Sequence, residues 1–534
     1  MDHTERRSAG RRAFAVAAAG IMIVILIVIV PLVGCRPAGR VPEAGGGTAA
    51  VDPRVGIPAE ERASVEKFCA DCHRLPLAES FPRSHWPEEV QQGFDLYALS
   101  ERTDLSPPSA AATIRYFQAG APEALLIPPA FERHDTPSPV TFQSLPLSAE
   151  AIGQNPAIAD IKVLPGPQGS NAVDLLTTDM RSGEIRRWSL VGPKVSTRVI
   201  ARGSSPCRLT AVSPASGFPS RWLVGDLGGF MPEDHHRGRV CAVDDAAPDA
   251  PAADVSLVAA DLARVVEVTP FDYDADGRTD LLVAEFGWRQ TGSLCVLLAG
   301  GEGASEGFDD RRQIIDPRAG AIGVRTADID GDGRDDIVAA FAQEHETVDV
   351  WFQSGAGTYE HREIIRFPDP SFGSSGFELI DLDADGRIDI LHTNGDTLDS
   401  GLAKPTHGIR CLFNLGEGRF RSQEIARMPG ASQASAADID GDGDLDIVAC
   451  SLLPAAGTHP AGTFDSILWF ENGGSGTYLP HRIQRNHCDH AAFALADLNG
   501  DGRIDLLTGT WEAAESQRPT WALEVWLNFP AAGQ

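Results

Sequence analysis

A nine-residue acidic segment occurs five times in the second half of the chain, beginning at residues 272, 328, 381, 438 and 497. Each copy has an oxygen-bearing side chain at positions 1, 3, 5 and 9, and glycine at position 6, where the chain must turn sharply. Carboxylates at this spacing are the ligands with which a loop binds calcium. The predicted ligands are Asp272, Asp274, Asp276 and Asp280; Asp328, Asp330, Asp332 and Asp336; Asp381, Asp383, Asp385 and Asp389; Asp438, Asp440, Asp442 and Asp446; and Asp497, Asn499, Asp501 and Asp505.

The residues around these segments distinguish them from the helix-flanked EF-hand. An EF-hand has a bidentate Glu at position 12, whereas the five copies have Val283, Ala339, His392, Ala449 and Thr508 there. Apolar residues follow the segments, as at 337–340, so we expect a strand, a calcium loop and a second strand. An acidic β-turn without an ion is the alternative, in which four carboxylates within nine residues repel one another without compensation.

A second chemical motif, Cys-Ala-Asp-Cys-His, occupies residues 69–73. It is the attachment signature of c-type haem, in which Cys69 and Cys72 form thioethers and His73 binds the iron. The alternatives are a disulfide or a redox-active C-x-x-C, and the latter normally lies in a βαβ unit, which this region does not predict. No Met occurs between Met22 and Met180, so His85 and His134 are the candidates for a sixth ligand. A position left empty, which would admit a small ligand, is the third possibility, and the choice stays open.

The N-terminus has the pattern of an export signal. Arginines precede an uncharged apolar run at 13–33, which ends in Leu-Val-Gly-Cys at residues 32–35. This ending resembles the bacterial lipoprotein box and implies acylation of Cys35; an uncleaved membrane helix is the alternative. Either anchor places the protein in the cell envelope, membrane-attached and facing the periplasm or the cell surface.

Composition and periodicity then divide the chain. Residues 1–35 are the signal or anchor, and the Gly-, Ala- and Pro-rich residues 36–58 are a flexible linker. Residues 59–131, with helices expected at 60–68, 86–90 and 109–119, resemble a small cytochrome c domain. Residues 132–150 form a second linker with a candidate closing strand at 140–142.

Residues 151–534 are built from repeats of about 55 residues. Each repeat combines the acidic segment with apolar strands and a later glycine turn, as at 355–359, 416–420 and 474–478. Four strands at this period predict a β-propeller blade. The repeats resemble the FG-GAP/VCBS family, with five matching blades at 266–528 and two upstream blades without acidic loops. The expected fold is therefore mainly β, a seven-bladed propeller preceded by a small α-helical cytochrome c-like domain.

The alternation of strands places the acidic loops at one rim; the loops between second and third strands, and those that link one blade to the next, lie at the opposite rim. Polar residues in the second set make that rim a candidate binding face, with a second metal site as one use of it. Ordinary loop hydrogen bonding is the alternative role for each histidine. The residues are His392, Asp396, His407, His487, Asp489 and His490.

The chain of 534 residues has a formal net charge of -30, which argues against nucleic acid as a partner. We expect an exported, membrane-tethered c-type haem electron-transfer protein, whose calcium-stabilised propeller docks a redox partner protein or a small-molecule or glycan ligand. The alternative is a propeller that is itself a dehydrogenase or a polysaccharide-acting enzyme and passes electrons to the haem. No nucleophile-and-base motif, phosphate loop or dinucleotide fingerprint supports a separate active site.

Overall fold

The computed structural model describes residues 53–127, 137–145, 147, 152–153, 155–164, 172–213, 221–244, 253–300, 308, 312–398, 400–453, 462–474, 476–485, 488–512 and 520–531. The chain divides into two compact units at residues 51 and 52, and every described residue belongs to the second. Cys35 and the apolar run before it, His134 and His487 lie outside the described residues. None of the described helices has the length and apolar character needed to cross a bilayer.

The N-terminal part of the second unit is helical, at the positions that the sequence predicts. Its helices are η1 (Pro53–Gly56), α1 (Ala59–Cys69), η2 (Ala78–Ser80), α2 (Trp86–Leu99) and α3 (Ala110–Gly120). The Ser109 hydroxyl accepts the Ala112 amide and so caps the start of α3. Trp86 stacks on Phe117 with ring centroids 4.1 Å apart, and both side chains are buried in the core of the helices.

The remaining strands form seven sheets and one short pair. Blades 1 to 3, from the first strand to the last, are β3 (Ile158–Val163), β4 (Val173–Asp179), β5 (Glu184–Val191) and β6 (Lys194–Arg202) with β10 (Ala253–Asp254); β7 (Pro206–Ala211), β8 (Trp222–Asp226), β9 (Gly238–Val243) and β11 (Ser256–Leu262); and β12 (Val265–Phe271), β13 (Asp280–Glu285), β14 (Ser293–Leu297) and β15 (Arg312–Asp316).

Blades 4 to 6 are β16 (Ala321–Ala327), β17 (Asp336–Phe341), β18 (Thr347–Gly355) and β19 (Thr358–Arg366); β20 (Ser374–Ile380), β21 (Asp389–Asn394), β22 (Gly408–Asn414) and β23 (Phe420–Arg427); and β24 (Ala431–Ala437), β25 (Asp446–Ser451), β26 (Ile467–Asn472) and β27 (Tyr478–Gln484). Blade 7 is β28 (His490–Ala496), β29 (Asp505–Thr510), β31 (Leu523–Pro530) and β1 (Val140–Leu145), and the short pair is β2 (Ile152–Gly153) with β30 (Thr520–Trp521).

The first strands of the seven sheets contact one another in a closed circle: β3 with β7, β7 with β12, β12 with β16, β16 with β20, β20 with β24, β24 with β28, and β28 with β3. This circle defines a seven-bladed β-propeller, as predicted. The second strands of blades 3 to 7 are buried along their whole length. Because neighbouring blades cover both faces of these strands, the two residues after the position 9 aspartate are apolar in every one of them.

Polar side chains on the first strands join neighbouring blades around the axis. In four blades a side-chain oxygen accepts a backbone amide of the next blade: Asp160 from Leu209 (2.8 Å), Glu267 from Val324 (3.0 Å), Glu378 from Ala436 (3.2 Å) and Gln433 from Phe493 (3.0 Å). Burial opposes ionisation of Glu267, but Arg325 and Arg208 outweigh it and keep the pKa of Glu267 below its usual value. Neighbouring blades are therefore connected to one another by hydrogen bonds around the propeller axis.

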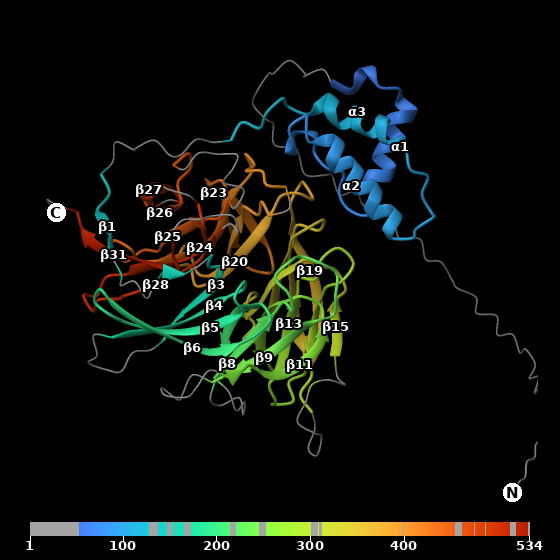
Figure 1. Ribbon diagram of the computed structural model, residues 1–534. Helices are drawn as coiled ribbons and strands as arrows, with labels where there is room; N and C mark the ends of the chain where they lie inside the picture. Colours follow the sequence, from blue (N-terminus) through green and yellow to red (C-terminus); the bar gives the residue numbers. More distant parts are fainter. Residues whose placement is uncertain are drawn as a thin grey trace, which may run out of the picture. The chain divides into compact units, whose positions relative to one another are not determined.

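The ring is closed by a strand from the other end of the sequence. β1 pairs with β31 in antiparallel register, from Val140 opposite Pro530 to Leu145 opposite Val525. Figure 1 shows β1 beside the red C-terminal strand β31. The closing strand predicted at 140–142 is therefore confirmed, and blade 7 holds together both ends of the propeller sequence.

Replacing Val140 tests this closure. Val140 is 3% exposed and packs with Trp469 and Phe493. We expect Val140→Asp to lower the free energy of unfolding by about 3 kcal/mol or more, because it buries an unpaired charge. Thr141→Asp, on the exposed face of the same strand, should change it by less than about 0.5 kcal/mol. Urea unfolding measures both, and equal effects would contradict a packed closing strand.

Candidate functional site

Each acidic segment is the loop between the first and second strands of its blade, as predicted; residues 272–280, for example, connect β12 to β13. The carboxylate at position 1 organises the turn. Asp328 Oδ1 accepts the Asp332 amide (3.0 Å), and Asp328 Oδ2 accepts the Gly333 amide (2.9 Å). Gly333 has φ +87°, in the left-handed region that glycine adopts without a steric penalty.

This turn gathers the predicted metal ligands. In blades 3, 4 and 5 the carboxylates at positions 1, 3 and 5 each bring one oxygen within 4.8 Å of the others, and in blade 6 Asp438, Asp440 and Asp446 do so. Carboxylate oxygens are the donors that Ca²⁺ prefers. Asp274 Oδ1 is buried without a hydrogen-bond partner, so the blade 3 loop has an oxygen directed to no group of the protein. The donor sets fit calcium.

The aspartate at position 9 has a further role that the spacing did not reveal. Its two oxygens accept one amide from position 2 of the loop and one from the end of the third strand. The pairs are Asp280 with Tyr273 and Ala299, Asp336 with Ile329 and Gln353, Asp389 with Leu382 and Asn414, Asp446 with Ile439 and Asn472, and Asp505 with Leu498 and Asn528, at 2.7 to 3.1 Å. Burial is the main cause that raises the pKa of Asp336 and Asp389 to about 6 and that of Asp446 to about 7.

The loops also touch the following blade. Asn414 Nδ2 of blade 5 donates to the Ile329 carbonyl in the blade 4 loop (2.8 Å), and Asn528 Nδ2 of blade 7 donates to the Ile439 carbonyl in the blade 6 loop (2.7 Å). The Tyr359 hydroxyl donates in the same way to the Tyr273 carbonyl (2.8 Å). Sequence reasoning missed these three side chains; for Asn414 and Tyr359 the signal was an Asn or Tyr beside the glycine turn of the repeat. The loops of blades 3, 4 and 6 therefore connect two blades and are also ligand sets.

The opposite rim differs from the expectation of an open face. His392, His407 and His490 are at most 1% exposed. His392 Nε2 lies 3.0 Å from Ser374 Oγ, and its ring stacks on Phe367. Burial lowers the pKa of His392 and His407 to about 3, so both are neutral at physiological pH. These histidines lack the accessible edge that a binding surface requires.

The acidic residues at this rim do not complete a metal site. Asp396 accepts the Leu398 amide (2.8 Å), and Asp489 lies 3.7 Å from His490. Within the described part of the chain, the groups of three or more His, Cys, Asp or Glu ligands with metal spacing all belong to acidic loops of blades 3 to 6.

Glu346 is a buried carboxyl group at this rim that the sequence analysis did not identify. It is 2% exposed, and its carboxylate accepts the amides of Gly373 (2.9 Å) and Ser374 (3.1 Å). Burial raises the pKa of Glu346 to about 8. Because this carboxyl group keeps its proton near neutral pH only in the folded protein, the free energy of unfolding depends on pH.

The C-x-x-C-H motif begins at the end of α1. Cys69 is the last residue of this helix, and burial raises the pKa of its thiol to about 11, whereas Cys72 is exposed. Both thiols are free. His73 Nδ1 lies 2.7 Å from the Arg74 carbonyl, which leaves Nε2 as the ring atom for a metal. Two thiols and an imidazole with one engaged nitrogen fit covalent haem attachment. His85 is the residue that precedes α2.

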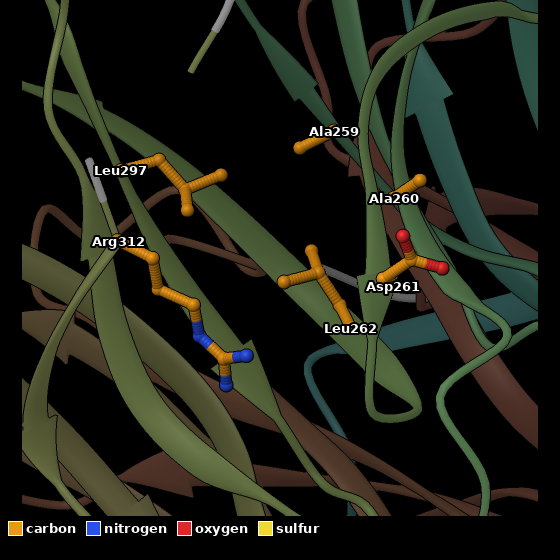
Figure 2. Close-up of a pocket in the computed structure, with 6 residues that line it drawn as sticks. All are labelled: Ala259, Ala260, Asp261, Leu262, Leu297 and Arg312. Carbon is orange, nitrogen blue, oxygen red and sulfur yellow. The ribbon is translucent and has the colours of Figure 1, made fainter. Parts of the chain in front are cut away.

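A cavity of about 280 Å³ lies between blades 2 and 3 (Figure 2), and none of the predicted site residues lines it. It is lined by Ala259, Ala260, Asp261, Leu262, Leu297 and Arg312. Arg312 is 2.7 Å from Glu285 Oε1, so its guanidinium already has an anionic partner inside the protein. This cavity contributes nothing to the loop sites.

Comparison with known proteins agrees with the repeat architecture. Residues 272–339 and 328–392 match the FG-GAP-like repeat family. No curated protein matches the sequence. Among solved structures, one similar chain is in a complex of S. cerevisiae dbp5 with nup159, gle1, ip6 and adp. The likeness has a TM-score of 0.40 at 9% identity and covers 74% of this chain and 97% of that one, a level that supports no conclusion about this protein. The chain thus contains FG-GAP-like repeats in a seven-bladed propeller with acidic loops.

Glu346 generates a pH prediction. Its pKa is about 8 in the folded protein and about 4.5 as its ordinary value, so only the folded state holds the proton between these values. Its stabilising contribution is full below about pH 4.5 and is lost as the pH rises through about 8. We expect Glu346→Gln to reduce the fall in unfolding free energy between pH 5 and 8 by about 3 to 4 kcal/mol. The control is Glu360→Gln, at a side chain that is 63% exposed; parallel pH profiles for all three proteins would contradict the assignment.

Proposed function

We propose that the chain is an exported, membrane-tethered c-type haem protein that transfers electrons, and that its propeller is a calcium-stabilised docking scaffold. The observation that carries the proposal is the haem-attachment motif at the end of α1, with one nitrogen of His73 already engaged by a backbone carbonyl. Export and tethering rest on the apolar run at 13–33 and on Cys35. The partner is a redox protein, or a small-molecule or glycan ligand, bound by the loops of the propeller.

Attachment uses three residues of this chain. The thiols of Cys69 and Cys72 would hold a haem through thioether bonds, formed by addition of each S–H across a vinyl group, which needs no oxidant. His73 would bind the iron through Nε2, with its ring oriented by the Arg74 carbonyl. When bound, the haem would supply a one-electron carrier. A sixth ligand would come from His85, from His134 or from neither.

The helical part is bonded to the propeller, which supports a scaffold role. The Leu77 amide and the Ser80 hydroxyl both donate to Asp369 Oδ2, each at 2.7 Å. Lys404 is 4% exposed, and its ammonium lies 4.5 Å from the centre of the Phe81 ring. These contacts connect the turn around η2 with the segment between β19 and β20 and the loop before β22. These contacts involve residues that follow the haem-attachment motif directly in the sequence, so a partner bound by the propeller would dock on the part of the chain that these residues contact.

Calcium in the acidic loops accounts for the rest of the proposal. A divalent ion offsets the repulsion among the carboxylates at positions 1, 3 and 5, which the loop's own backbone amides and, in blades 3 to 5, one arginine offset only in part. Because each loop also bonds to its third strand and, in three blades, to the next blade, the ion stabilises the ring and not only one turn.

Covalent haem is tested on protein from a host that exports the chain and attaches haem. We expect the wild type to keep its haem through acid–acetone extraction and to show the reduced α-band of a c-type cytochrome. Cys72→Ser should lose attachment at that thiol and lower the bound haem by at least about tenfold, whereas Ala70→Ser, which keeps the C-x-x-C-H spacing, should retain it. A wild-type protein recovered without haem would contradict the electron-transfer proposal.

Calcium removal tests the scaffold. We expect EDTA to lower the thermal midpoint of unfolding by several degrees, and added calcium to restore it, because the ion binds the folded state alone. Magnesium at the same concentration should restore less, since it prefers a smaller octahedral set. Differential scanning calorimetry gives the midpoints, and identical midpoints for the stripped and reloaded protein would exclude structural calcium.

A further inference from the structure

The five acidic loops differ at position 7. Blades 3, 4, 5 and 7 have an arginine there, Arg278, Arg334, Arg387 and Arg503, whereas blade 6 has Asp444. The blade 6 loop therefore contains five carboxylates and no cation, and the blade 7 loop contains three carboxylates and one arginine. Position 7 contributes its backbone carbonyl to a calcium loop of this type, so its side chain is free to have another role.

In blades 3, 4 and 5 the arginine pairs with the carboxylate at position 5: Arg278 with Asp276, Arg334 with Asp332, and Arg387 with Asp385. The arginine is held there by the third strand, because Arg334 Nε donates to the Gln353 carbonyl (2.9 Å) and Arg387 Nε to the Asn414 carbonyl (2.7 Å). The other oxygen of the position 5 carboxylate accepts the amide of position 7. Both oxygens of this ligand are therefore engaged before any ion arrives.

The blade 6 loop has no such counter-ion. Asp442 Oδ1 accepts the Asp444 amide (3.0 Å) as in the other blades, but no basic side chain of the described residues forms an ion pair with Asp442. Asp444 Oδ1 is buried and has no hydrogen-bond partner. Asp438, Asp440 and Asp446 already lie within ligand distance of one another. No basic side chain within this loop therefore offsets its negative charge.

We infer that the residue at position 7 ranks the loops by calcium affinity, so that the blade 6 loop fills first and empties last. The inference rests on the proposed calcium binding and adds an order to it. In blades 3, 4 and 5 a cation must displace the guanidinium from the position 5 carboxylate, whereas in blade 6 nothing is displaced. Reversing one charge within about 4 Å of a divalent ion changes affinity by roughly tenfold or more.

The ranking has a structural consequence at the closing blade. The Ile439 carbonyl in the blade 6 loop accepts Asn528 Nδ2 of β31, the strand that pairs with β1. The tightest ion therefore sits at the joint between blade 6 and the blade that closes the ring. As calcium falls, the closure keeps its ion after the loops of blades 3 to 5 have lost theirs.

Calcium titration of the metal-stripped full chain by calorimetry tests the ranking. The wild type should show one tight site followed by weaker ones. Asp444→Arg should weaken the tight site at least tenfold without changing the total number of ions, and Arg387→Asp should create a second tight site. Arg427→Asp gives the same change in net charge as Arg387→Asp, at a β23 side chain that is 56% exposed and remote from the loops; it should leave the isotherm unchanged.

The outcomes separate the ranking from the function on which it rests. A wild type that binds no calcium overturns the calcium proposal and the ranking together. Calcium binding with the same isotherm in wild type and Asp444→Arg, or equal effects of Arg387→Asp and Arg427→Asp, overturns the ranking alone. Should Asp444→Arg fail to fold, Asp444→Asn removes the charge without adding a cation. A tight site weakened about threefold supports the ranking, and an unchanged one overturns it.

Discussion

The propeller depends on a buried aspartate at position 9 of each acidic loop, whose two oxygens accept amides from two different strands. Because these carboxylates are at most 1% exposed, removing one leaves two donors without partners, a cost of about 1–3 kcal/mol for each buried group. The same aspartate fixes the end of the loop relative to the third strand. In blades 3, 4 and 5 the carboxylates at positions 1, 3 and 5 converge within this turn.

Repeated contacts between neighbouring blades then hold the ring together. The loops reach the next blade through Asn414, Asn528 and Tyr359, the axis does so through acceptors such as Glu267, and β1 closes the last blade. This arrangement also creates electrostatic repulsion, because each loop concentrates carboxylates at one rim. An arginine at position 7 offsets part of that charge from within, and a bound divalent ion offsets more, which connects metal binding to the integrity of the ring.

The sequence predicted what is local and periodic. The clustering of the loop carboxylates, the strand–loop–strand units, the three helices and the closing strand all follow from spacings within a few residues or from repeats along the chain. The burial of His392 and the bonds of Glu346 to Gly373 and Ser374 could not be predicted, because they depend on how neighbouring blades pack. The same holds for Asp336, which the spacing marks as a ligand, although its bond to Gln353 needs the third strand in place.

Hydrogen exchange at the amides that donate to the position 9 aspartates tests the central claim most directly. Gln353, Asn414 and Asn472 are such donors at the ends of third strands. If divalent ions in the loops hold strands and blades together, these amides exchange slowly with calcium present and at least tenfold faster after chelation, ahead of amides in the helices α1 to α3. Exchange at these positions that is the same in both states would show that the loops hold the ring without an ion.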